Sequence, residues 1–133
     1  EAQTVKLNLG LILGYVLAPI AWVIGIEWND AVIAGGLIGQ KVVLNEFIAY
    51  LQLSQTPVGT GAGQISENTR LILTYALCGF ANFASIAIQI GGIGGLAPER
   101  RSDLARFGLR AVLGGSIATL MTATIAGVLI HLR

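Results

Sequence analysis

Four long apolar stretches occupy most of this chain and constrain its fold more than any other feature. They cover residues 7–26, 31–53, 71–96 and 107–132. Each comes close to the roughly 20 apolar residues that an α-helix needs to cross a bilayer. Charged residues make up only 11% of the chain, against about a quarter in an average soluble domain. So little charge cannot cover a water-facing surface, and the pattern predicts an all-α integral membrane protein segment.

The second stretch, residues 31–53, is not typical of a plain membrane span. It carries Lys41, Asn45 and Glu46 near its middle. A charged side chain at the centre of a spanning helix costs about 2.5–3.5 kcal/mol on insertion scales. A re-entrant hairpin avoids this cost, because irregular backbone at membrane depth is tolerated where it lines a cavity. We therefore predict two half-helices that meet near residues 40–44, with a polar tip facing a cavity.

The third stretch, residues 71–96, also has a polar middle. The run GFANFAS at residues 79–85 lies between two apolar halves and predicts a helix that unwinds near Gly79. Asn82 and Ser85 are three residues apart, a spacing that places two side chains on one helical face. Discontinuous helices with polar midpoints indicate a transporter binding site.

Proline and glycine give further local expectations. Pro19 lies in the first stretch and is expected to kink or break its helix, because proline lacks a backbone N–H. Glycine pairs and runs favour close packing of helices through small residues. They are Gly10 with Gly14, Gly35 with Gly39, and the run at residues 91–95.

Arginines predict how the chain is oriented in a membrane. Four of them, Arg100, Arg101, Arg106 and Arg110, lie at or near the connection between the third and fourth stretches. Cytoplasmic connections carry an excess of Lys and Arg, so this connection is expected to be cytoplasmic. The connection at residues 54–68, rich in Gly, Ser and Thr, is then outside, together with the C-terminus.

Glu46 is the strongest single indication of function, because an ionisable residue in a membrane segment marks a functional site by default. Its partner is a cation, a substrate hydroxyl or a donor side chain, and the structural alternative is a salt bridge to Lys41. Asn82 and Ser85 add an amide and a hydroxyl, which suit the donors and acceptors of sugar hydroxyls. The alternative for these two residues is hydrogen bonding between helices.

Other classes of function find little support in the sequence. A net charge of +1 argues against a nucleic-acid-binding surface. The single His131 lies near the C-terminus, so neither a Ser-His-Asp nor a Cys-His set can be assembled, and no enzyme is expected. The main alternative to a transporter is a small membrane helix-packing subunit without transport activity of its own. Such a subunit would have no need for Glu46 at a hairpin tip.

Two runs of residues resemble the signatures of a known family, the concentrative nucleoside transporters. Residues 41–50 (KVVLNEFIAY) resemble the first signature, and residues 75–86 (YALCGFANFASI) resemble the second. Residues 97–101 (APERR) and 122–127 (TATIAG) match further family positions. The resemblance extends from about Gly14 to Gly127.

The resemblance implies one C-terminal nucleoside transporter domain over residues 1–133. This domain is expected to contain a scaffold helix at 1–28, a re-entrant hairpin at 29–55, a broken transmembrane helix at 68–97 and a last transmembrane helix at 104–132. The family's first hairpin, which reads the nucleobase, precedes these elements. Upstream sequence is therefore expected to be missing from this chain.

The resemblance also implies secondary active symport of nucleosides, driven by a sodium or proton gradient across the bacterial inner membrane. Glu46, Asn82 and Ser85 would bind the ribose, with Phe80 and Asn45 at the same site. No cofactor and no metal site are expected, because the coupling cation would be bound mainly by residues outside this segment. The expected partners are the nucleoside, the cation, the lipid bilayer and the N-terminal remainder of the transporter, in a homotrimer and without nucleic acid.

Overall fold

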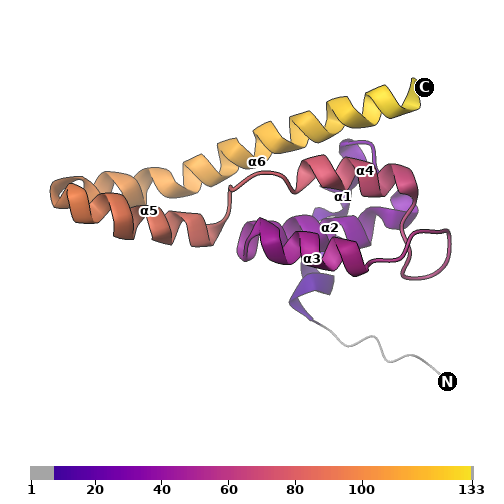
Figure 1. Cartoon of the computed structure of the whole chain (residues 1–133), viewed down its shortest axis with the longest axis horizontal. Helices are drawn as coiled ribbons and strands as arrows, with labels where there is room; N and C mark the ends of the chain where they lie inside the picture. The colour runs from indigo at the N-terminus through magenta and orange to yellow at the C-terminus, as the bar shows by residue number, and fades with distance from the viewer. Residues whose placement is uncertain (1–7, 133) are drawn as a thin grey trace.

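The computed structural model describes residues 8–132, which form α-helices and one short 3-10 helix. The elements are α1 (Leu9–Val23), α2 (Trp28–Val43), α3 (Glu46–Gln55), α4 (Glu67–Ala76), α5 (Phe83–Leu96), η1 (Pro98–Arg100) and α6 (Arg101–His131). Figure 1 shows α6 running alongside the other helices over the whole length of the molecule. The all-α prediction is confirmed. The predicted scaffold helix at 1–28 includes residues 1–7, and the predicted domain at 1–133 also includes residue 133; these residues lie outside the described part of the chain.

Side-chain caps divide the apolar stretches into separate helices. An asparagine or serine oxygen satisfies a backbone N–H in the first turn, where a helix has no partner of its own. Asn8 caps α1 through Leu11 N (2.8 Å), Asn45 caps α3 through Ile48 N (3.0 Å), Ser66 caps α4 through Thr69 N (3.2 Å), and Asn82 caps α5 through Ser85 N (2.8 Å). Each capped start fixes where a helix begins inside or beside an apolar stretch.

Both predicted breaks are present in the structure. The hairpin of α2 and α3 turns at Leu44 and Asn45, at the end of the predicted interval. Residues 77–82 connect α4 to α5 without regular helix (Figure 1). Gly79 lies within this unwound segment.

Glycines allow α1 and α2 to pack at close range, as expected. The chain bends by 116° between these two helices. A Cβ atom on Gly35 would lie 2.6 Å from the Gly14 carbonyl oxygen, and one on Gly14 would lie 2.6 Å from the Val32 carbonyl oxygen. On Gly39 it would lie 2.6 Å from the Cβ of Leu13. Any larger side chain at these positions would push the two helices apart.

Pro19 was expected to kink or break its helix, and the prediction of a break is wrong. Helix α1 continues through Pro19 to Val23. Ala18 and Ala21 on either side of the proline are buried, and the Ala18 backbone lies against Gly35 of α2. Packing against α2 therefore keeps the last turn of α1 helical despite the missing N–H.

The glycine run at residues 91–95 does not form a helix-packing seam with the described part of the chain. A Cβ atom on Gly91, Gly92 or Gly95 would meet nothing within 4 Å, and only Gly94 faces a neighbour, the side chain of Arg101. The reason is that α5 turns another face toward α6. There Ile86 packs against Gly108, where an added Cβ would lie 2.7 Å from the Ile86 side chain.

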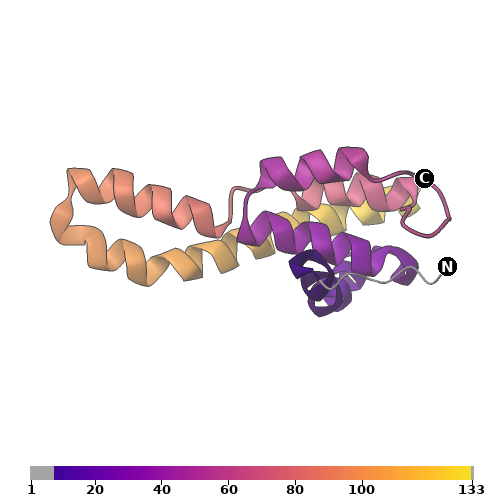
Figure 2. The same cartoon turned by 90° about the horizontal axis from the view of Figure 1, so that it is seen from below.

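The core lies at one end of the molecule, and α5 with the first half of α6 extends away from it as an arm (Figures 1 and 2). The buried apolar cluster comes from α1, α2, α3, α4, their connections, and Ala123 of α6. No residue of α5 belongs to this cluster. The unwound segment at residues 77–82 therefore lies where the core meets the arm.

Helix α6 is the element best suited to cross a membrane. Together with η1 it forms a 34-residue unit, Pro98–His131, which contains an 18-residue stretch with a mean hydropathy of 1.8. In the described part of the chain it is the one helix long and apolar enough to cross alone; the bent pair α1 and α2 together would make a second span. Exposed apolar residues recur every four positions along it, at Leu109, Leu113, Ile117, Met121 and Ile125. Such a stripe suits contact with lipid or with other membrane helices.

Candidate functional site

The two helix breaks meet at one hydrogen bond between side chains. Glu46 is the first residue of α3, and Asn82 immediately precedes α5. The Asn82 Nδ2 donates to Glu46 Oε2 at 3.1 Å. These residues lie 36 positions apart in the sequence, so the hairpin tip and the unwound segment come together only in the folded chain.

Asn82 connects this carboxylate to Ser85. Its Oδ1 accepts hydrogen bonds from the Ser85 backbone N at 2.8 Å and from the Ser85 Oγ at 2.9 Å. The structure corrects one detail of the prediction. Asn82 is not part of a helical face shared with Ser85, because its backbone is extended (φ −148°, ψ 166°) and it serves as the N-cap of α5. Its side chain is only 1% exposed, so both its donor and its acceptor are held in place.

Helix ends give this site its electrostatic character. Glu46 lies in the first turn of α3, and its partner Asn82 caps the start of α5. The N-terminal end of a helix carries partial positive charge, which favours a carboxylate there. Asn45 contributes as the cap of α3, since its Oδ1 accepts the Ile48 N–H. That oxygen is therefore already used in holding the hairpin tip.

Lys41 is not the partner of Glu46. It is buried, with 2% of its surface exposed, but no salt bridge joins it to the carboxylate. Within residues 8–132 the recorded salt bridge is Arg100 with Asp103, at 2.7 Å. The structural alternative considered for Glu46 is thus not realised in this fold, and the carboxylate is bound by an amide instead.

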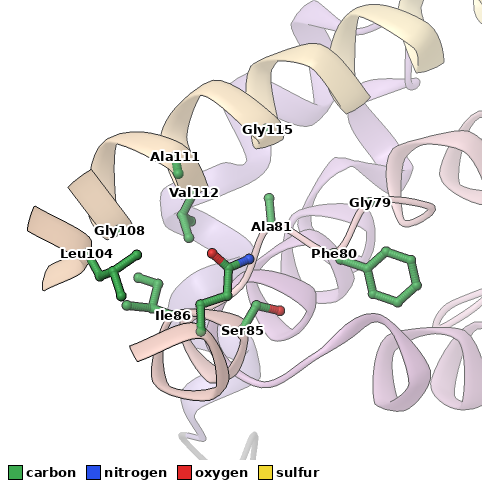
Figure 3. A pocket seen from close by; sticks show the side chains of 11 residues that line it. Gly79, Phe80, Ala81, Ser85, Ile86, Leu104, Gly108, Ala111, Val112 and Gly115 are labelled. Carbon is green, nitrogen blue, oxygen red and sulfur yellow. The ribbon is translucent and has the colours of Figure 1, made fainter. Parts of the chain in front are cut away.

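A cavity of about 300 Å³ borders part of this site. It lies between the unwound segment, α5 and α6, and both Phe80 and Ser85 line it. Figure 3 shows the Phe80 ring extending away from the side chains of Leu104 and Val112, and Phe80 as a residue is 73% exposed. Neither Glu46 nor Asn45 lines the cavity. The structure therefore brings Glu46, Asn82 and Ser85 into one network, and Phe80 joins Ser85 only in lining the neighbouring cavity.

The network leaves hydrogen-bonding capacity for a ligand. The bond to Asn82 uses one oxygen of Glu46, and the Oε1 atom has no recorded partner. A carboxylate, an amide and a hydroxyl can together accept from and donate to several hydroxyl groups. Among the described residues, no group of three or more His, Cys, Asp or Glu side chains could hold a metal ion.

Two polar contacts between the hairpin and α4 were not anticipated from the sequence, one at each end of α4. The Tyr50 hydroxyl donates to the Thr74 carbonyl oxygen at 2.5 Å, and the Ser66 backbone N donates to Asp30 Oδ2 at 2.9 Å. Both join the hairpin to α4 or to its cap. The sequence did offer a signal for each contact. Tyr50 carries a hydroxyl inside an apolar run, and Asp30 is an acidic residue at the edge of an apolar run.

Comparison with known proteins assigns the chain to a family. The family described as "Na+ dependent nucleoside transporter C-terminus" matches residues 2–127. The uncharacterized transporter YutK of Bacillus subtilis (strain 168) is 55% identical over 123 residues, covering 92% of this chain and 29% of YutK. The putative nucleoside permease NupX of Escherichia coli (strain K12) is 50% identical over 125 residues, covering 94% of this chain and 30% of NupX.

A solved structure has the same fold. CNTnw in an inward-facing, substrate-bound state superposes with a TM-score of 0.87 at 50% sequence identity, covering 96% of this chain and 31% of CNTnw. The chain thus spans about a third or less of the proteins it matches. These relatives are transporters and permeases rather than enzymes. The chain is an integral membrane protein segment that belongs to the sodium-dependent nucleoside transporter family and corresponds to its C-terminal region.

Proposed function

We propose that this chain supplies the ribose-binding half of a symporter that moves nucleosides across the bacterial inner membrane, driven by a sodium or proton gradient. Glu46, Asn82 and Ser85 bind the sugar hydroxyls, with Phe80 and Asn45 at the same site. The proposal follows the family to which the chain belongs and the chemistry of these side chains. The remainder of the transporter, N-terminal to this segment, supplies the nucleobase contacts and most ligands of the coupling cation.

The contact between Glu46 and Asn82 carries this proposal. A hydrogen bond between an amide and another polar side chain can also hold packed helices together, but a subunit that only packs helices would not need an ionisable carboxylate at this position. Half-helix ends with polar side chains are how transporters hold a ligand at membrane depth. Because Glu46 Oε1 has no recorded partner, an incoming hydroxyl can donate to it without first breaking the network.

The helices then take the following roles. We assign α1 to a scaffold, the α2–α3 hairpin to a re-entrant element whose tip reaches the binding site, α4 and α5 to a broken transmembrane helix, and α6 to the last transmembrane helix. The arginines around η1 favour a cytoplasmic position for the end of the arm. Family membership further supports assembly of the complete transporter as a homotrimer.

Removing the Glu46 carboxylate tests this proposal. The full-length transporter would be expressed in cells that lack nucleoside uptake of their own, and uptake of labelled uridine would be measured together with the amount of transporter in the membrane. Glu46→Ala is expected to abolish uptake at unchanged membrane level. The matched control is Glu67→Ala, because Glu67 is also the first residue of a capped helix but is exposed and outside the network.

Glu67→Ala is expected to transport at close to the wild-type rate. Near wild-type uptake by Glu46→Ala would refute the proposed role of the carboxylate. Equal loss in both variants would show that glutamate is needed at helix starts for folding, and would also refute the binding role.

A further inference from the structure

Helix α4, like any α-helix, ends with backbone carbonyls that its own helix does not satisfy, and the Thr74 carbonyl is one of them. The Leu77 N donates to the Leu73 oxygen at 2.9 Å, which continues the α-helical pattern. The next amide, Cys78 N, donates instead to the Tyr75 oxygen at 3.3 Å. In a continuing helix Cys78 N would have bonded the Thr74 oxygen. The carbonyl of Thr74 is therefore left over at the point where the chain unwinds.

The Tyr50 hydroxyl forms a hydrogen bond with this carbonyl. It donates to the Thr74 oxygen at 2.5 Å across 24 positions of sequence. Tyr50 lies four residues after Glu46 on α3, so the two side chains share one helical face. Glu46 accepts from Asn82, at the far end of the unwound segment. One face of α3 thus holds the chain on both sides of residues 77–82.

We infer that Tyr50 is a positioning residue for the sugar site. Its hydroxyl fixes where α4 ends, and hence how much chain separates α4 from Asn82, which must reach Glu46. This inference rests on the proposed function of Glu46, Asn82 and Ser85. The ring of Tyr50 also packs against the buried cluster, but packing needs only the ring, so the positioning role belongs to the hydroxyl.

Tyr50→Phe separates these two contributions, because it keeps the ring and removes the donor. The control is Tyr75→Phe, which removes the hydroxyl of an exposed tyrosine on α4 that donates to no recorded partner. Both variants are made in the full-length transporter. The measurements are KM and maximal uptake rate per transporter in the membrane, for uridine and for its 2′-deoxy and 3′-deoxy analogues.

Tyr50→Phe is expected to raise the KM for uridine by about two- to tenfold, the range for one lost hydrogen bond. The KM should rise less for the analogue that lacks the hydroxyl held by Asn82 or Ser85, and the maximal rate should stay within about twofold, because the loss falls on ligand binding alone. Tyr75→Phe should leave all three values unchanged. An unchanged KM for uridine in Tyr50→Phe, or the same rise for every analogue, would overturn the inference.

Amide hydrogen exchange without nucleoside gives a readout that is independent of transport. In Tyr50→Phe, residues 77–82 should exchange about two- to tenfold faster than in the wild type, while the middle of α6 is unchanged. If the wild-type transporter does not move uridine, the proposed function fails, and hydrogen exchange alone decides whether the Tyr50 hydroxyl holds residues 77–82 in place. If the wild type does move uridine and neither exchange nor KM responds to Tyr50→Phe, the positioning role of Tyr50 is wrong and the proposed function stands. Faster exchange with an unchanged KM would also overturn the positioning role.

Discussion

The substitution Gly35→Ala tests the close packing of α1 against α2. The added methyl would lie 2.6 Å from the Gly14 carbonyl oxygen and 2.9 Å from the Ala18 backbone N. Ordinary contacts of a Cβ atom begin at 3.4 Å, so the two helices would have to separate by several tenths of an ångström. Both obstacles are backbone atoms and cannot rotate out of the way. Overpacking of this kind costs about 1–3 kcal/mol.

Gly92→Ala is the matched control for this prediction. Gly92 also lies inside a helix, α5, but a Cβ atom there would meet no described atom within 4 Å. Both substitutions gain the same helix propensity, about 1 kcal/mol relative to glycine. The difference between the two variants therefore isolates the clash.

The assay is the free energy of unfolding of the full-length transporter, measured by titration with sodium dodecyl sulfate in mixed micelles. Gly35→Ala is expected to be less stable than Gly92→Ala by about 1–3 kcal/mol. Equal stability of the two variants would show that α1 and α2 do not approach as closely as the structure indicates, and would refute the reasoning.

Two further predictions concern topology and sugar recognition. Single cysteines introduced at Gly59 and Asn29 should react with an impermeant thiol reagent from outside, and one at Ser102 should react only from inside. The reason is that the arginine-rich connection is expected in the cytoplasm. Labelling of Asn29 from the cytoplasmic side would make residues 31–53 a plain span. Asn82→Ala or Ser85→Ala should reduce uptake of ribonucleosides more than of analogues lacking the contacted hydroxyl, because a site built for that hydroxyl discriminates against its loss. Competition by a panel of bases should keep its order, and reordered bases with unchanged sugar discrimination would contradict the ribose assignment.

The positions of the two breaks could be predicted because the chain marks them with residue types that a continuous membrane helix excludes. Lys41 and Glu46 cannot face lipid cheaply, and Asn82 and Ser85 place polar groups in the middle of an apolar stretch. The structure places breaks at residues 44–45 and 77–82. Composition and periodicity were sufficient to predict the breaks, because the cost of a polar or charged side chain in an apolar helix depends on that residue and its immediate sequence.

The arrangement of the site was harder to predict, because it depends on backbone conformation at single residues. Spacing alone suggested that Asn82 and Ser85 share a helical face. In the structure Asn82 is a cap with extended backbone, which turns its amide toward Glu46 and its oxygen toward Ser85. Whether a polar residue ends up within a helix or before it depends on where the helix begins, and spacing does not reveal this.

Contacts between distant residues account for the remaining differences. Tyr50 lies in an apolar run that gives no partner for its hydroxyl, and in the structure this hydroxyl satisfies a carbonyl 24 positions away. Pro19 is tolerated because α2 packs against the end of α1. The glycines at 91–95 resemble those of the α1–α2 seam in composition, but within the described part of the chain only Gly94 among them faces another helix, at the side chain of Arg101. In each case the outcome depends on a neighbouring element that a local pattern cannot specify.

The most direct test of the central claim is ion-driven uptake by the purified full-length transporter in liposomes. An inward sodium or proton gradient should drive accumulation of labelled uridine by the wild type, and collapse of the gradient should abolish it. Glu46→Ala should not accumulate uridine, and Glu46→Gln should retain part of the activity, because it keeps an acceptor oxygen but loses the charge-assisted hydrogen bond. Failure of the wild type to accumulate uridine under either gradient, or full accumulation by Glu46→Ala, would contradict the account.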